Sequence, residues 1–187
     1  MPSIDISFLN NLKEDYKNYK TFIETGTNVG ETIFHMEQYF NKLHTIEISE
    51  RLYNNTKNSY NGNKINFLLG DSSKVFPLIL SNIEDNAIFF LDGHWSSGDT
   101  GRGEKDCPLL EEITQINNLF KNKAIIIVDD CRLFGKGPNN GMNEDWTDIN
   151  SDKLINILKD RLVEFYYLDS THSKNDRLII HINNITQ

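Results

Sequence analysis

Short apolar runs alternate with stretches of helical character along most of this sequence. Five runs rich in β-branched, leucine and aromatic residues occupy residues 21–24, 43–47, 65–69, 87–91 and 124–128. Stretches with helical periodicity lie between them at about 31–40, 50–60, 72–80 and 109–120. Continuous apolar strands alternating with helices are typical of a parallel sheet covered by helices on both faces. The alternation therefore predicts an α/β fold.

The two ends of the chain depart from this alternation. A helical stretch at 152–161 is followed by two strand-like runs, 164–168 and 178–182, with a polar turn between them. Such a pair predicts an antiparallel hairpin that closes the sheet with a reversed last strand. Residues 1–20 are expected to form one amphipathic helix at the N-terminus.

Length and composition limit the class of protein. A chain of 187 residues with 38% hydrophobic and 25% charged residues fits a single globular domain over 1–187. The net charge of −8, with no dominant run of Lys and Arg, argues against binding nucleic acid through its phosphates. No apolar run is long enough to cross a membrane, and the first residues do not resemble a signal peptide. Cys107 and Cys131 lie in separate elements, which favours a reducing, cytoplasmic location over a disulfide framework.

The first strand leads into a glycine turn, residues 24–30, and then into a helix. Glycine permits a tight turn and lets a ligand approach the backbone closely. Glu24 and Glu31 bracket the turn and would repel a pyrophosphate, so a cationic or zwitterionic ligand fits better. The dinucleotide pattern G-x-G-x-x-G, started at Gly26, is broken by Asn28 and Glu31. An ordinary βα turn without a ligand is the alternative that this stretch alone leaves open.

Each predicted parallel strand ends in, or is followed by, an acidic residue. These residues are Glu24, Glu47, Asp71, Asp92 and the adjacent pair Asp129 and Asp130. A parallel sheet brings its strand ends to one edge, where like charges repel unless a ligand or cation neutralises them. An acid in the position of Glu47 can accept hydrogen bonds from ribose hydroxyls, as in dinucleotide-binding folds. Asp71 or Ser72 can also cap the helix that follows.

Asp92, Asp129 and Asp130 form the sharpest pattern among these acids. Two adjacent aspartates at one strand end, with a third from a neighbouring strand, make an open site for a hard cation. Mg²⁺ takes oxygen ligands and usually keeps several waters, so it suits such a site. Solvated or helix-capping acids are the alternative interpretation.

Four motifs together resemble class I S-adenosylmethionine-dependent methyltransferases over about residues 21–133. They are the acid–glycine turn at 21–32, Gly70-Asp71-Ser72, Leu91-Asp92-Gly93-His94-Trp95 and Val128-Asp129-Asp130. The last two are similar to the metal-binding motifs of metal-dependent O-methyltransferases of the catechol and macrocin types. The resemblance implies a Rossmann-like three-layer sandwich whose seven-stranded sheet is mostly parallel.

The resemblance also implies two ligands. It implies that S-adenosylmethionine is bound by Glu24, Gly26, Thr27, Asn28, Gly30, Glu47, Asp71, Ser72 and Asp92. It further implies that a divalent metal, expected to be Mg²⁺, is held by Asp92, Asp129 and Asp130.

The implied activity is methyl transfer to a hydroxyl oxygen of a small molecule or sugar, with Asp92 and His94 as catalytic residues. The catechol type has a lysine after its Trp as general base, where this chain has Ser96. His94, a residue type with an ordinary pKa of about 6.5, is the natural substitute base. A loop histidine that points to solvent is the alternative. The expected partner is a small-molecule acceptor, not nucleic acid or membrane, in a pocket that is open or completed by a second subunit of a homodimer.

Three other functions stay open at this point. The first is a metal-independent methyltransferase whose aspartates only shape the pocket. The second is a Rossmann-like hydroxylase of the cephalosporin type, although its iron site normally needs two histidines and only His94 is near. The third is a non-catalytic module that binds an adenosine ligand. Two long glycine-containing segments, 93–108 and 134–146, follow strand ends on the ligand-binding edge. Residues 95–106 are expected to act as a substrate lid, with a solvated flexible loop as the alternative.

Overall fold

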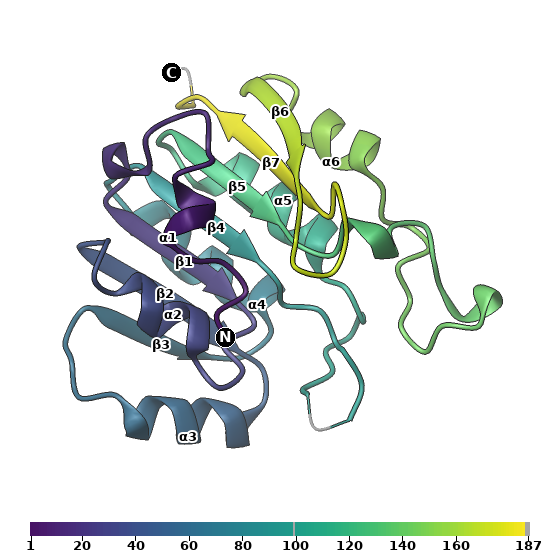
Figure 1. The fold of residues 1–187 in the computed structure, drawn as a ribbon, viewed down its shortest axis with the longest axis horizontal. Coiled ribbons are helices and arrows are strands. Elements are labelled where there is room, and N and C mark those ends of the chain that lie inside the picture. The colour runs from purple at the N-terminus through teal and green to yellow at the C-terminus, as the bar shows by residue number, and fades with distance from the viewer. Residues whose placement is uncertain (99, 186–187) are drawn as a thin grey trace.

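The computed structural model describes residues 1–98 and 100–185, in which seven strands form one sheet in the order β3-β2-β1-β4-β5-β7-β6 (Figure 1). The strands are β1 (Thr21–Thr25), β2 (Lys42–Glu47), β3 (Ile65–Leu69), β4 (Ala87–Leu91), β5 (Ala124–Val128), β6 (Leu162–Leu168) and β7 (Arg177–Ile182). The first five strands run parallel, and β7 is antiparallel to both β5 and β6. The expected Rossmann-like sheet with a reversed last strand is confirmed.

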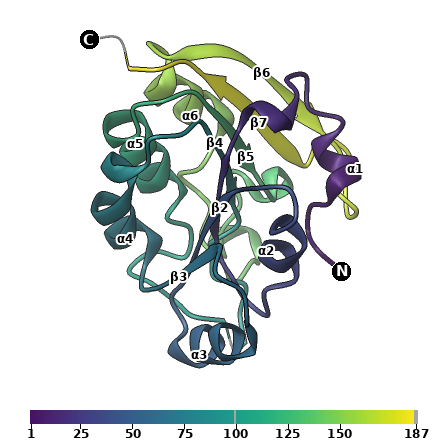
Figure 2. The same ribbon diagram turned by 90° about the vertical axis from the view of Figure 1, so that its left-hand side faces the viewer.

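Helices cover both faces of the sheet and complete three layers (Figure 2). They are α1 (Ile6–Leu9), α2 (Glu31–Met36), α3 (Glu50–Ser59), α4 (Ser72–Ile79), α5 (Leu109–Leu119) and α6 (Ser151–Leu158). Helices α4, α5 and α6 lie on one face, whereas α1 and α2 lie on the other; α3 contacts β2 and β3. Within the described part of the chain, no helix has the length and apolar character required to span a bilayer.

The central strands divide their side chains between two hydrophobic cores. Ile23, Phe89 and Ile126 pack toward α4, α5 and α6, while their neighbours Phe22 and Ile88 pack toward α1 and α2. All of these side chains are fully buried. Because both faces of the sheet are covered, the strands are continuously apolar and not alternating, as the sequence indicated.

The prediction of one helix over residues 1–20 is wrong. The segment contains only the single turn α1 and a 3₁₀ turn, η1 (Tyr16–Asn18). The side chain of Asp5 caps the first turn at Phe8 N, and the side chain of Asp15 caps the second at Lys17 N. Asp and Asn side chains compete for backbone groups in this way, which splits an amphipathic pattern into short turns.

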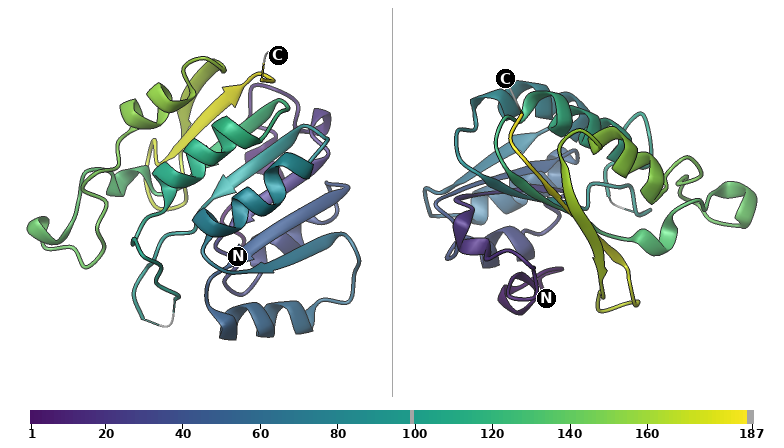
Figure 3. Two further views of the ribbon diagram at one scale, coloured as in Figure 1. Left: turned by 180° about the vertical axis from the view of Figure 1, so that it is seen from behind. Right: turned by 90° about the horizontal axis from the view of Figure 1, so that it is seen from above.

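The two long connections leave the sheet at the carboxyl ends of β4 and β5 (Figures 1 and 3). One joins β4 to α5 through residues 92–108, and the other joins β5 to α6 through residues 129–150 and includes the 3₁₀ turns η3 (Cys131–Leu133) and η4 (Pro138–Asn140). The strand order reverses between β1 and β4, and open α/β sheets bind ligands at the carboxyl ends beside such a point. The fold therefore places both connections beside the expected ligand site.

Candidate functional site

A pocket opens at the carboxyl ends of the strands around the point of reversal, where open α/β sheets bind ligands. The structure brings six residues expected at a cofactor site into its wall: Gly26, Asn28, Glu47, Asp71, Ser72 and Asp92. His94 and Trp95 line the same pocket from the connection after β4. The remaining cofactor candidates, Glu24, Thr27 and Gly30, are not among the residues that line it.

The glycine turn packs directly against the end of β4. Gly26 has φ +84°, and a Cβ there would collide with the carbonyl oxygen of Asp92. The Gly26 amide donates to the carbonyl of Ile46 over 2.9 Å, which ties the turn to β2. Gly30, whose backbone is also left-handed with φ +81°, is the N-cap of α2. The turn thus requires glycine both for its backbone conformation and for its close contact with Asp92.

Glu24 lies beneath the turn, not in the pocket wall. It is 2% exposed, and its Oε2 accepts a hydrogen bond of 2.8 Å from the Thr45 hydroxyl, which is 2.6 Å from the Thr27 hydroxyl. Burial is the main cause that raises the pKa of Glu24 to about 8, and the charge of Glu47 adds to it, while the Thr45 bond opposes it. At neutral pH the Glu24 side chain is therefore mostly a neutral acid.

Glu47 and Asp71 hold backbone groups and face the pocket at the same time. The two oxygens of Glu47 accept hydrogen bonds from the amides of Asn28 and Ser49, each over 2.8 Å. Asp71 is the N-cap of α4 and accepts from the Ser73 amide over 2.9 Å. Because carboxylate oxygens can accept more than one hydrogen bond, these roles leave capacity for ligand hydroxyls or amines.

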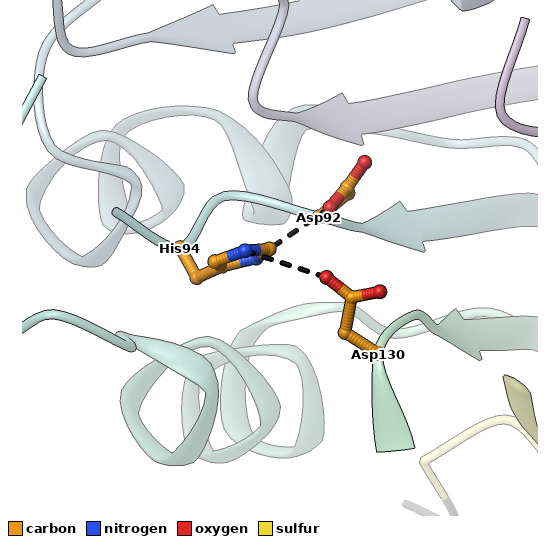
Figure 4. A group of neighbouring side chains, drawn as sticks. All are labelled: Asp92, His94 and Asp130. Atoms are coloured by element: carbon orange, nitrogen blue, oxygen red, sulfur yellow. Dashed lines mark ion pairs between the residues drawn. The ribbon is translucent and has the colours of Figure 1, made fainter. Parts of the chain in front are cut away.

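His94 lies between two carboxylates from neighbouring strand ends, Asp92 and Asp130 (Figure 4). Its Nδ1 is 3.6 Å from Asp92 Oδ1, and its Nε2 is 3.3 Å from Asp130 Oδ2. One potential ligand atom from each of these three residues lies within 4.8 Å of the others. A third carboxylate oxygen, Glu144 Oε2, lies 3.8 Å from His94 Nε2. This group offers oxygen and imidazole donors, and such donors suit a divalent cation.

Asp129 does not belong to this group, although it is adjacent to Asp130. Its Oδ1 accepts a 3.0 Å hydrogen bond from Arg177 Nε and another from the Asp130 amide. Asp130 has a left-handed backbone with φ +62°, so the two side chains leave the end of β5 in different directions. A second acidic group, Asp129, Asp130 and Asp176, is contacted by the guanidinium groups of Arg132 and Arg177.

Two of the acids at this edge, Asp92 and Asp129, have raised pKa values. Burial is the main cause that raises the pKa of Asp92 well above its ordinary value, and the charges of Asp129, Asp130 and Glu24 add to it. Burial also raises the pKa of Asp129, although the nearby Arg177 opposes this. Buried carboxyl groups that repel one another gain most from a bound cation, and this is the pattern found at many functional sites.

Three residues at the site were not identified from the sequence. Trp146 and Glu144 come from the connection after β5: the Trp146 ring lies edge-on to His94 with centroids 4.9 Å apart, and its indole N–H donates to Glu144 over 3.1 Å. Only the glycine content of that loop suggested a function. Glu112, in the first turn of α5, is 1% exposed beneath Gly93, and its Oε1 has no hydrogen-bond partner among the described residues. No motif in the sequence indicated it.

The chain shares its fold with solved methyltransferases at low sequence identity. The O-methyltransferase TomG from Streptomyces achromogenes, solved with S-adenosylmethionine, is 14% identical with a TM-score of 0.62, covering 90% of this chain and 74% of that one. The N-methyltransferase NodS from Bradyrhizobium japonicum WM9, solved with S-adenosyl-L-homocysteine, is 12% identical with a TM-score of 0.56, covering 90% and 79%. An rRNA methylase from Streptococcus thermophilus is 12% identical with a TM-score of 0.54, covering 90% and 89%.

These similarities establish a shared fold among proteins that methylate different acceptors. No protein-family model matches the sequence, and no curated protein sequence matches it. Because one fold can carry unrelated functions, the activity has to be argued from the site itself.

Proposed function

We propose that this protein transfers a methyl group from S-adenosylmethionine to a hydroxyl oxygen of a small molecule or sugar. The observation that carries the proposal is that the acid–glycine turn, Asp92 and His94 line one pocket at the strand edge, with Asp130 in reach of Asp92 and His94. The two solved relatives that hold S-adenosylmethionine or S-adenosyl-L-homocysteine share the fold and so support this choice of cofactor.

In this proposal the glycine turn, formed by Gly26, Thr27, Asn28 and Gly30, lies under the cofactor's methionine end. Glu24 beneath the turn supplies negative charge to the cationic cofactor when it ionises. Further ligand groups come from the end of β2 and the start of α4: Glu47 accepts hydrogen bonds from ribose hydroxyls, and Asp71 with Ser72 forms the wall beside the adenine. Asp92 lies between the cofactor and the acceptor.

The acids at the ends of β4 and β5 fit a divalent cation. Asp92 and Asp130 offer oxygens close enough to share one ion, and a bound cation would offset the burial and repulsion that raise the pKa of Asp92. We propose Asp92 and Asp130 as the acids that would hold a Mg²⁺ or Mn²⁺ ion; Asp129, the third acid expected from the sequence, lies beside them and is paired with Arg177. A bound divalent cation would lower the pKa of an acceptor hydroxyl.

His94 is proposed as the general base. The acceptor oxygen forms a bond to the methyl carbon, the carbon–sulfur bond of the sulfonium breaks, and S-adenosylhomocysteine leaves. The acceptor's proton passes to an imidazole nitrogen of His94, whose charged form Asp92 and Asp130 can stabilise. Trp146 packs against the ring and limits its movement. The same geometry also allows His94 to be a third metal ligand, and the two roles differ in their effect on metal affinity.

The charge of the chain bears on the choice of acceptor. The net charge of −8 disfavours RNA as acceptor, so a small-molecule substrate is proposed even though one relative with this fold is an rRNA methylase. From the sequence alone we also propose a cytoplasmic location and one domain over residues 1–187. We further propose that a homodimer partner completes the pocket.

Calorimetry with S-adenosylmethionine, S-adenosylhomocysteine and NAD, each with and without Mn²⁺, tests the proposal. We expect micromolar affinity for the first two ligands, roughly −8 kcal/mol, and none for NAD. A methyl-release assay over a panel of hydroxyl acceptors should then show turnover that stops in excess chelator. Binding of NAD at equal or higher affinity contradicts the cofactor assignment, whereas full turnover in chelator favours a metal-independent methyltransferase. Cofactor binding with no turnover on any acceptor favours a non-catalytic binding module.

A further inference from the structure

The connection between β6 and β7 contains a buried carboxylate that lies beside the end of β5. Asp176, at the end of this connection, is fully buried, yet it lies 46 positions after Asp130 in a part of the chain with no cofactor or metal motif. Its backbone carbonyl accepts from the Cys131 amide over 2.9 Å, and its Oδ1 accepts from the Arg132 amide over 2.9 Å. Asp176 therefore holds the two residues that directly follow Asp130.

Arg132 links this buried carboxylate to Asp130. One nitrogen of its guanidinium, Nη1, donates both to Asp176 Oδ2 over 2.6 Å and to Asp130 Oδ1 at short range. The Ser170 hydroxyl donates to the same Asp176 oxygen over 2.6 Å, which fixes the carboxylate from its other side. A charge-assisted bridge of this kind constrains geometry as well as charge.

The consequence for Asp130 is that its two oxygens face different partners. Oδ1 is held by Arg132, whereas Oδ2 faces His94 Nε2 at 3.3 Å and so points toward Asp92. The backbone of Asp130 is left-handed, with φ +62° and ψ +33°. The hydrogen bonds from the Cys131 and Arg132 amides to Asp176 hold the two residues that follow this turn.

We propose that Asp176, acting through Arg132, is a positioning residue that aims the Oδ2 of Asp130 into the cation site. This inference rests on the proposed function, because it concerns the metal held at that site. Groups that orient metal ligands without touching the metal typically change its affinity by about 10- to 100-fold when they are replaced.

The test compares Asp176→Asn with Asp169→Asn, a matched change in the same connection. Asp169 is exposed and accepts from the Asn175 amide, and among residues 1–98 and 100–185 it has no hydrogen bond to Arg132. In Asp176→Asn the amide oxygen can still accept from the Arg132 amide, but the amide nitrogen cannot accept from the guanidinium. Free Mn²⁺ is counted by electron paramagnetic resonance during titration of each protein, and affinity for S-adenosylhomocysteine is measured by calorimetry.

We expect Asp176→Asn to bind Mn²⁺ about 10- to 100-fold more weakly than the wild type, with unchanged S-adenosylhomocysteine affinity, while Asp169→Asn matches the wild type on both. If Asp176→Asn does not fold, Arg132→Lys is the second variant, because this side chain is partly exposed. Lysine keeps the positive charge but loses the guanidinium that links Asp176 to Asp130, so Mn²⁺ affinity should again fall.

Wild-type Mn²⁺ affinity in whichever of these two variants folds overturns this inference and leaves the metal site intact. A parallel loss of Mn²⁺ and S-adenosylhomocysteine binding shows a merely structural role and also overturns it. Absence of Mn²⁺ binding by the wild type rejects the metal site itself, and the positioning role with it.

Discussion

Asp129 and Arg177 form a buried ion pair across the junction of β5 and β7, with 3.0 Å between Asp129 Oδ1 and Arg177 Nε. Both side chains are less than 10% exposed. A second guanidinium nitrogen of Arg177 donates to the carbonyl of Ser3, and the guanidinium packs on the Phe8 ring at 4.9 Å. The pair therefore ties the reversed strand, the end of β5 and the N-terminal segment together.

Asp129→Ala should lower the free energy of unfolding by about 3–5 kcal/mol, because it leaves the buried Arg177 without its partner. Asp129→Asn keeps an oxygen acceptor for Arg177 and should lose less. Asp148→Ala, which removes an exposed acid paired with Lys153, is the control and should change stability by no more than about 1 kcal/mol. Urea denaturation measures all three. An Asp129→Ala variant as stable as the control contradicts the structural role of the pair.

Gly26→Ala should destabilise the protein and abolish binding of S-adenosylhomocysteine. An alanine there must adopt a left-handed backbone, which costs about 1 kcal/mol, and its Cβ meets the Asp92 carbonyl. Gly98→Ala is the matched control, because Gly98 also has positive φ but has open space around its Cβ position. Thermal unfolding and calorimetry should separate the two variants. If the two variants have equal unfolding temperatures and equal affinities for S-adenosylhomocysteine, the close contact with Asp92 is not the reason for glycine at position 26.

Binding of S-adenosylmethionine near pH 7 should release a proton from Glu24. The pKa of Glu24 is about 8 in the free protein, so the group is mainly protonated at pH 7, and a cationic ligand favours its ionised form. Affinity should therefore rise with pH up to about 8. Calorimetry in two buffers of different ionisation enthalpy counts the protons. Glu24→Gln is the control for the ligand's own titration, and proton release that persists in this variant assigns it to another group.

The sequence predicted the sheet better than it predicted the site. The five parallel strands and the reversed hairpin follow from apolar runs and their spacing, because both faces of the sheet are buried. Side-chain directions at the strand ends depend on contacts between distant segments. Asp129 and Asp130 look equivalent in the sequence. In the structure Asp129 is bonded to Arg177, 48 residues later in the chain, whereas Asp130 has a left-handed backbone and its side chain lies beside His94.

The residues missed by the sequence analysis lie where sequence patterns do not locate side chains. Glu144, Trp146 and Asp176 lie in irregular connections, where no periodicity relates sequence position to spatial position. Glu112 lies on a helix whose pattern accounts for its apolar neighbours only. Short motifs identify site residues that directly follow a strand. They do not identify residues from distant parts of the chain that lie at the same site.

Stability of the ligand-free protein should fall between about pH 4.5 and 7, partly because of Glu112. Burial raises the pKa of Glu112 from 4.5 to about 7, so within this window the folded state binds more protons than the unfolded state. The loss is complete above the folded pKa and amounts to about 3 kcal/mol at most. Glu112→Gln should flatten the profile in urea denaturation at pH 5 and pH 8, whereas Glu111→Gln, next to it and paired with Lys105, should not. An unchanged slope in Glu112→Gln contradicts the assignment.

His94→Ala should reduce turnover by about 10²- to 10⁴-fold, the usual contribution of a positioned acid–base group. The imidazole lies between Asp92 and Asp130, packed edge-on against Trp146, so its loss removes the proton acceptor without touching the glycine turn. Affinity for S-adenosylhomocysteine should therefore be unchanged. His172→Ala, at an exposed position in the β6–β7 connection, is the control and should keep wild-type turnover.

Mn²⁺ titration of His94→Ala then separates the two roles that the geometry allows for this residue. As a base, His94 contributes to turnover and to the acidic limb of the rate–pH profile, and Mn²⁺ affinity stays at the wild-type value in the variant. As a metal ligand, its removal weakens Mn²⁺ binding in proportion to the loss of turnover. We expect the first result. Near-normal turnover with an unchanged pH profile would exclude both roles and leave ionisation of the acceptor to the metal alone.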